Sequence, residues 1–285
     1  MTISLGPLAL AADRLLAVAL IWLFLACGSL IAARGDMRAA TASWIAVIVG
    51  LLVARTAYVV RHADAHAPEP WSILAVWQGG FLPWAGIAAA AAAVAVWLRR
   101  SRATPLLLGV LAGLVAVHAV AAPALEPAPR PLARGLMLTD MEGGAIALDT
   151  LRGKPMVINL WATWCPPCQR ELPMLAEVAA TSRVPILLVN QGQDSATVAA
   201  YLAERKVPGT HVFLDHSGRT GDAAGGLVLP TTLFVDAKGR IVRRHSGEIS
   251  RAALADGLAL IARSWGQAAV TSQARAPRRT PASGS

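Results

Sequence analysis

Charged residues are scarce in this chain of 285 residues. They make up 15% of it, against about 25% in an ordinary soluble protein, and the mean hydropathy is +0.51. A wholly soluble and a wholly disordered protein are both excluded, because each needs far more polar surface. Almost every long apolar run lies before residue 123. The chain therefore divides into a half that resembles a membrane protein and a half of soluble composition.

Cysteine is also scarce. Three cysteines are too few for the disulfide scaffold of a small secreted domain. Cys27 lies inside an apolar run with no second thiol nearby in the sequence, which favours simple packing. The other two form the motif Cys165-Pro166-Pro167-Cys168.

Acidic residues are outnumbered, and the formal net charge is +9. Nucleic-acid binding would need basic residues gathered with aromatic ones on one stripe, and this sequence does not gather them. Two groups instead flank apolar runs and a third lies in a tail: Arg34 and Arg38; Arg99, Arg100 and Arg102; Arg275, Arg278 and Arg279. We therefore predict no nucleic-acid partner and take the first two groups as topology signals.

Four apolar runs in residues 1–122 have the length that a bilayer-spanning helix needs, and they cover residues 15–33, 44–60, 81–98 and 105–122. Loops rich in arginine stay in the cytoplasm. The loops with Arg34 and with Arg99 should therefore be cytoplasmic, and the less basic loop after the second run should lie outside. Four spans then place both termini outside, in the periplasm, with the protein in the bacterial inner membrane.

Three motifs give the membrane half a family resemblance: Ser4-Leu5-Gly6-Pro7-Leu8-Ala9-Leu10, Ala54-Arg55-Thr56-Ala57-Tyr58-Val59-Val60 and Trp77-Gln78-Gly79-Gly80. In order and spacing they resemble the first part of the prolipoprotein diacylglyceryl transferases, which transfer a lipid group from phosphatidylglycerol. The family places a catalytic His-Gly-Gly where this chain has Trp84-Ala85-Gly86, and its later helices are absent. We expect a truncated relative that anchors the protein. Arg55, inside an apolar run, is open to two interpretations: a functional site, or snorkelling to the interface.

Residues 123–134 are rich in proline and predict an extended linker. Residues 135–266 then alternate in pattern: strands at 156–161, 185–190 and 211–215, helices at 166–180, 195–205 and 251–263, and a hairpin at 231–245. This order predicts an α/β domain with a mixed central sheet and helices on both faces. We expect the tail, residues 267–285, to be disordered.

The strand-turn-helix pattern around residue 161 sets Cys165 at a helix N-terminus, where free amide groups and the helix dipole stabilise a thiolate. Two intervening residues let Cys168 reach the same sulfur, so a mixed disulfide on Cys165 can be resolved internally. The alternatives are metal sites. Zinc needs a second ligand pair, which this sequence does not offer, whereas Cu(I) held by the two thiolates stays open. We expect neither a resident metal nor a cofactor.

The segment Trp161-Ala162-Thr163-Trp164-Cys165-Pro166-Pro167-Cys168, with Glu171 and Leu229-Pro230-Thr231-Thr232, resembles the membrane-tethered thioredoxin-like proteins of the TlpA/ResA group. The resemblance implies a thioredoxin fold, a cis Pro230 beside the cysteines, and Leu229 offering backbone to a substrate peptide. It also implies that Glu171 handles protons. Asn159 stands where thioredoxin has a buried aspartate. Trp164 is open to two interpretations, packing around the site or contact with substrate.

The resulting hypothesis is a four-span membrane anchor carrying a periplasmic thiol–disulfide oxidoreductase of thioredoxin fold. By resemblance it acts as a reductant in cytochrome c or metal-site maturation. Its partners would be oxidised periplasmic proteins and a transmembrane thiol-transporting reductant. The rivals are a Cu(I) carrier without turnover and a diacylglyceryl transferase.

Overall fold

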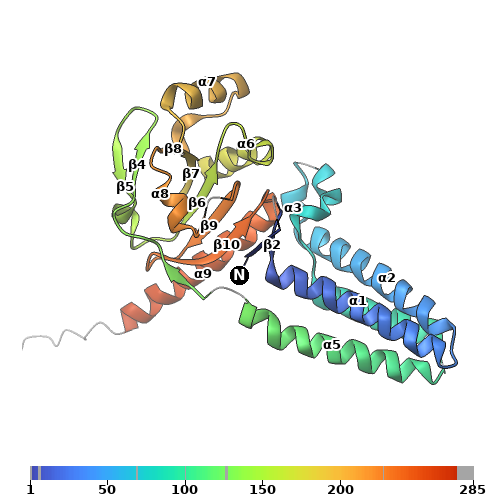
Figure 1. The fold of residues 1–285 in the computed structure, drawn as a ribbon. Helices are drawn as coiled ribbons and strands as arrows, with labels where there is room; N and C mark the ends of the chain where they lie inside the picture. The colour runs from blue at the N-terminus through green and yellow to red at the C-terminus, as the bar shows by residue number, and fades with distance from the viewer. Residues whose placement is uncertain are drawn as a thin grey trace, which may run out of the picture. The chain divides into compact units, whose positions relative to one another are not determined.

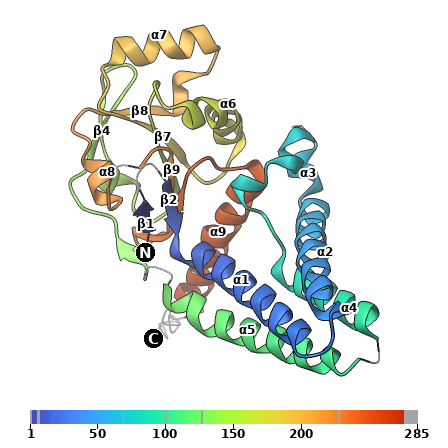
Figure 2. The same cartoon turned by 45° about the vertical axis from the view of Figure 1, so that its right-hand side comes forward.

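The computed structural model describes residues 2–5, 8–68, 70–99, 101–125, 128–226 and 228–274. The chain forms two compact units, Met1–Ala128 and Pro129–Ser285, shown in Figures 1 and 2. The boundary falls inside the predicted linker.

The first unit is a hairpin followed by a helical bundle. Strands β1 (Thr2–Leu5) and β2 (Leu8–Ala11) pair antiparallel. The long helices are α1 (Ala12–Ala33), α2 (Arg38–Arg61), α4 (Pro83–Leu98) and α5 (Ala103–Leu125). Between α2 and α4 lie the short helix α3 (Ala63–His66) and the 3-10 turns η1 (Pro70–Leu74) and η2 (Val76–Gln78).

Three described helices, not the four we predicted, are long and apolar enough to span a membrane: Leu15–Ala33, Arg38–Arg61 and Ala103–Leu125. The predicted third span is wrong in this respect, because α4 has 16 residues. At 1.5 Å per residue it reaches about 24 Å, short of the roughly 30 Å of a hydrocarbon core. Its start is fixed by Pro83 in its first turn, and by Gly79 and Gly80, whose φ angles of 80° and 81° break the apolar run before it.

Helices α2 and α4 pack closely through small residues. A side chain added at Gly86 would lie 2.7 Å from the carbonyl oxygen of Gly50 and 2.8 Å from the Cβ of Ala54. Small residues of this kind let the backbones of membrane helices approach one another. The backbone N–H of Leu82 also donates to the Ala54 carbonyl, so α4 begins beside the C-terminal third of α2.

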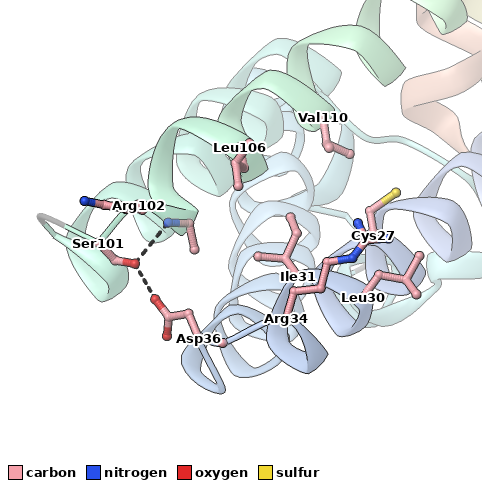
Figure 3. Close-up of a pocket in the computed structure, with 11 residues that line it drawn as sticks. Cys27, Leu30, Ile31, Arg34, Asp36, Ser101, Arg102, Leu106 and Val110 are labelled. Carbon is pink, nitrogen blue, oxygen red and sulfur yellow. Dashed lines mark hydrogen bonds between the residues drawn. The ribbon is translucent and has the colours of Figure 1, made fainter.

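The two arginine-bearing turns of the bundle meet at one end. Asp36, in the turn after α1, accepts a hydrogen bond from the hydroxyl of Ser101, in the turn after α4 (Figure 3). In chain order, α1 and α4 run toward this end, while α2 and α5 run away from it. Helix α5 therefore carries the chain to the opposite end of the bundle.

The second unit contains an eight-stranded mixed sheet with the order β3-β10-β9-β6-β7-β8-β4-β5. Its strands are β3 (Arg130–Pro131), β4 (Met137–Asp140), β5 (Ala145–Ala147), β6 (Met156–Trp161), β7 (Ile186–Gln191), β8 (Val212–Asp215), β9 (Thr231–Val235) and β10 (Arg240–Ser246). Strands β6, β7 and β8 are parallel, and the other pairs are antiparallel.

Helices cover both faces of this sheet, as the sequence pattern predicts. Side chains of α6 (Pro166–Thr181), α7 (Ser195–Arg205) and α9 (Arg251–Ala274) pack on one face with Val157, Trp161 and Phe234. On the other face, α8 (Arg219–Ala223) and residues 132–148 pack on Ile158 and Leu160. Alternation along β6 thus decides which residues meet α6, and it places Asn159 on the α6 face.

The predicted bounds need two corrections. Helix α5 runs through Pro123 to Leu125, and Arg130–Pro131 pair with β10, so these parts of the predicted linker are structured. Proline is accepted there because β3 is an edge strand. Helix α9 runs to Ala274, beyond the predicted start of the tail at residue 267, and residues 275–285 lie outside the described part of the chain.

Candidate active site

Cys165 and Cys168 lie where β6 ends and α6 begins. Cys165 has extended dihedral angles and is the N-cap of α6, with Pro166 in the first turn. Its Sγ accepts the backbone N–H of Cys168 at 3.4 Å. Proline suits this position because the first-turn amides have no partner within the helix. The local sequence therefore places a sulfur at the positive end of the α6 dipole, which favours the thiolate.

The two cysteines form a disulfide, with 5.2 Å between their Cα atoms. Cys168 is fully buried and Cys165 is 3% exposed, whereas the neighbouring Trp164 is 65% exposed. Trp164 therefore does not pack around the site, and its contact with substrate stays a prediction. The buried aromatic ring of the motif is Trp161, at 1% exposed.

Glu171 is buried one turn after Cys168 in α6, with 3% of its surface exposed. Its Oε1 accepts from Asn159 Nδ2 at 2.7 Å, and its Oε2 accepts from the backbone N–H of Ile249 at 2.7 Å. Burial raises the pKa of Glu171 to about 8, although both donors favour the carboxylate and so lower it. A carboxyl group with this pKa can gain and lose a proton near neutral pH, and its part in proton transfer stays a prediction.

Asn159 supports that carboxyl group. Its Nδ2 also donates to Thr232 Oγ1 at 3.1 Å, and its Oδ1 has no partner among the described residues. Because the side chain is fully buried, an aspartate here would place a second carboxyl group against Glu171. The neutral amide avoids that repulsion.

The loop before Thr231 carries the other predicted site residues. The Leu229–Pro230 bond is cis, as the resemblance implied. Leu229 packs against the core cluster that contains both cysteines, and Pro230 is buried. Thr231 Oγ1 donates to the Val228 carbonyl at 2.6 Å and so holds the loop from within.

Sequence reasoning missed two contributors to this site. The Ile249 amide belongs to the segment before α9, 78 residues from Glu171. Gln193 follows β7 and contacts Thr163 of the redox loop. Only the position of Gln193 in the sequence could have indicated its role. Gln193 follows β7, which runs parallel to β6, and the carboxyl ends of neighbouring parallel strands lie at the same edge of a sheet.

Two further features belong to the first unit. A cavity of about 680 Å³ between α1 and α5 is lined by Cys27, Leu30, Arg34 and Arg102, among others (Figure 3). Arg55 donates to the carbonyls of Ser72, Ile73, Gly79 and Gly80 at 2.6–3.1 Å. It thereby pairs the backbone of the irregular segment between α3 and α4, a role that neither earlier interpretation included.

Within the described residues, no group of three or more His, Cys, Asp or Glu side chains could hold a metal ion.

Comparison with known proteins decides the family. The family model named Redoxin matches residues 119–260. The thiol-disulfide oxidoreductase ResA of Halalkalibacterium halodurans is 32% identical over 143 residues, which cover 47% of this chain and 81% of that protein. The chain belongs to the ResA family of thiol–disulfide oxidoreductases.

Other relatives extend the comparison beyond ResA itself. The thiol:disulfide interchange protein DsbE of Pseudomonas fluorescens is 38% identical over 109 residues, 38% of this chain and 61% of that protein. The solved structure of MTB dsbF in its mixed oxidised and reduced forms is 26% identical, with a TM-score of 0.42, and covers 46% of this chain and 98% of its own. The prolipoprotein diacylglyceryl transferase model matches residues 2–125. In this ResA-family chain the redox domain thus follows, in sequence, a region that matches the diacylglyceryl transferase model.

Proposed function

We propose that this oxidoreductase is a membrane-anchored periplasmic reductant of protein disulfides. The observation that carries the proposal is the buried pair Cys165 and Cys168 at the N-terminus of α6, with Glu171 one turn away and Leu229–Pro230 in cis. No part of this arrangement requires a bound group.

The exchange proceeds in two steps. The Cys165 thiolate attacks one sulfur of a substrate disulfide, forms a mixed disulfide and expels the first substrate thiolate. Cys168 loses its proton and attacks Cys165 Sγ, which releases the second substrate thiolate and leaves the Cys165–Cys168 disulfide. Two electrons pass to the substrate, and both substrate sulfurs take up protons. Glu171 is suited to accept the Cys168 proton, because its pKa of about 8 lies near that of a thiol.

The bundle supports the proposed orientation. Arg34, Arg38, Arg99 and Arg102 lie in or beside the two turns that the Asp36–Ser101 hydrogen bond joins. Positive charge gathered at one end of a bundle favours the cytoplasmic side. The helix α5 leads away from that end, so the redox domain that follows it would lie in the periplasm.

The partners follow from the reaction. Oxidised periplasmic proteins would be the substrates, in the maturation of cytochrome c or of metal sites. Each turnover leaves the pair oxidised, so a transmembrane thiol-transporting reductant would restore the dithiol. The Leu229 backbone and the exposed Trp164 are the groups that we assign to substrate contact.

Trapping tests the proposal. In a Cys168→Ala variant the mixed disulfide on Cys165 cannot be resolved, so full-length protein should accumulate in covalent complexes that dithiothreitol dissolves. A Cys165→Ala variant is the control and should form none. Periplasmic partners whose own disulfides accumulate in a deletion strain would support a reductant. If Cys168→Ala traps no protein, the proposed exchange at Cys165 is wrong. If substrate disulfides are lost in the deletion strain, the proposed direction is wrong.

A further inference from the structure

Thr163, two residues before Cys165, is held by side chains from two other parts of the fold. Its backbone N–H donates to Gln193 Oε1 at 2.8 Å, and its Oγ1 accepts from Gln193 Nε2 at 2.7 Å. Its carbonyl accepts from Gln169 Nε2 at 2.6 Å. The backbone donor, the backbone acceptor and the hydroxyl of Thr163 are thus all partnered.

The Gln193 amide makes a further contact, and its orientation is fixed. Asn190 Nδ2 donates to Gln193 Oε1 at 2.9 Å, so this oxygen receives two N–H donors. Turning the Gln193 amide over would set its NH₂ against the Thr163 backbone N–H, a donor that cannot reverse, so this bond decides the orientation. Asn190 is fully buried in β7 and is aligned with Trp161 at the end of β6. Gln193 is therefore anchored to the sheet beside the redox loop.

We propose that Gln193 is a positioning residue of the redox centre, which holds Thr163 and thereby brings Cys165 to Cys168 in the dithiol state. In the oxidised state the disulfide itself restrains the two cysteines. After reduction that restraint is gone, and residues 162–165 form a turn outside the flanking strand and helix, in which the Cys165 N–H donates to the Ala162 carbonyl at 3.3 Å. The two hydrogen bonds between Gln193 and Thr163 then keep the loop in the geometry that disulfide formation needs.

This inference rests on dithiol–disulfide exchange, and it is independent of the direction and compartment proposed above. Loss of the Gln193 contacts frees the dithiol state more than the cross-linked disulfide state. The equilibrium constant for forming the Cys165–Cys168 disulfide should fall. A tenfold fall makes the potential of this two-electron couple about 30 mV less negative.

The test measures that equilibrium in full-length protein in detergent, poised with glutathione, with the redox state of Cys165 and Cys168 read by alkylation and peptide mass. Gln193→Ala should lower the equilibrium constant about threefold to tenfold. Gln193→Glu should be at least as reducing as the parent, because a carboxylate accepts from Thr163 N–H and Asn190, and the Thr163 hydroxyl can donate to it. Ser195→Ala, at an exposed position just after the same loop, should leave the constant unchanged.

A role in folding alone gives a different result. A folding role would lower the stability of the oxidised and the reduced protein equally. The equilibrium constant of Gln193→Ala would then match that of the parent, and this result would overturn the proposal. An equal fall in Gln193→Glu would overturn it too. If Gln193→Ala does not accumulate, Thr163→Val removes the hydroxyl contact and keeps the backbone contact. It should lower the constant by less than tenfold, and no change would contradict the inference.

Discussion

At the scale of single residues, the protonation of Glu171 is decided by burial against hydrogen bonding. The Ile249 amide and Asn159 Nδ2 both favour the carboxylate, yet burial raises the pKa to about 8 from a usual 4.5. Between these values the folded chain holds a proton that the unfolded chain has released. The free energy of unfolding should therefore fall as pH rises from about 4.5 to 8, and level off above 8.

Glu171→Gln should remove this pH dependence. The shift corresponds to a change on the order of 5 kcal/mol in the free energy of unfolding, and a neutral amide has no such proton to lose. The Gln side chain can accept from Ile249, and it can donate to Asn159 Oδ1 once the Asn159 amide turns over to face it. The pH dependence can be checked by urea unfolding of the oxidised protein at several pH values, with cleavage of the redox domain by a protease as the measure of unfolding.

Glu204→Gln is the matched control, because it removes a carboxyl group that is 76% exposed. Its pH dependence should follow the parent. If Glu171→Gln loses stability with rising pH as steeply as the parent does, the titrating group is elsewhere.

Asn159→Asp should place two carboxyl groups together, since Asn159 Nδ2 is 2.7 Å from Glu171 Oε1. Like charges at that distance raise one of the two pKa values. We expect the apparent pKa of the Glu171 carboxyl, followed by infrared spectroscopy, to rise above 8. An unchanged band titration would show that the two groups do not interact.

The sequence predicted some residues of this site and missed others. Cys165, Cys168 and Glu171 follow one another at intervals of three residues, so helical spacing alone brings each close to the next. Gln193 and Ile249 approach the site from strands and loops far along the chain. No local pattern reports such contacts, because they depend on which strands become neighbours in the sheet.

At the scale of helices and strands, strong periodicity was the reliable signal. The pattern predicted β6, α6 and α7 to within a residue or two. It missed the short strands β4 and β5 and the five-residue helix α8, which are too short to show a period and depend on pairing partners. The apolar run at 81–98 also predicted a longer helix than α4, because hydropathy does not register the glycine and proline backbone before it.

Packing between α9 and β9 gives an element-scale prediction. Gly257→Ala in α9 would gain about 1 kcal/mol of helix propensity. The new methyl group would overlap the ring of Phe234, which is fully buried and cannot move aside, at a cost of about 1–3 kcal/mol. We expect net destabilisation of the redox domain. Ala259→Gly, at an exposed position of the same helix, measures the propensity effect alone. Stabilisation by Gly257→Ala would contradict the packing described here.

The contact between α2 and α4 leads to a second prediction about helix packing. Gly86→Leu should separate these helices, because its side chain would meet the Gly50 carbonyl and Ala54. Gly113→Leu in α5 is the control, since a Cβ there meets nothing within 4 Å. The fraction of protein recovered from membranes in a protease-resistant form should fall severalfold for Gly86→Leu and stay near the parent value for Gly113→Leu.

At the scale of the whole molecule, composition and charge foretold the division into two units. The scarcity of charge before residue 123 marked the membrane half, and the structure places the boundary at Ala128. Charge also suggested which turns belong together. The contact between Asp36 and Ser101 joins two turns that are 65 residues apart, a pairing that hydropathy alone leaves open.

In living cells we expect a dithiol at Cys165 and Cys168 that faces the periplasm and is kept reduced. A membrane-impermeant thiol label, applied to intact cells with a permeabilised outer membrane, tests this. Single Cys165→Ala and Cys168→Ala variants would serve as controls. We expect the label to reach Cys165 without added reductant, and Cys168, which is fully buried, to be labelled without reductant once the protein is denatured. Thiols that the label reaches only after the inner membrane is lysed would contradict the orientation, and a disulfide that stays unlabelled until reduced would contradict the proposed reductant.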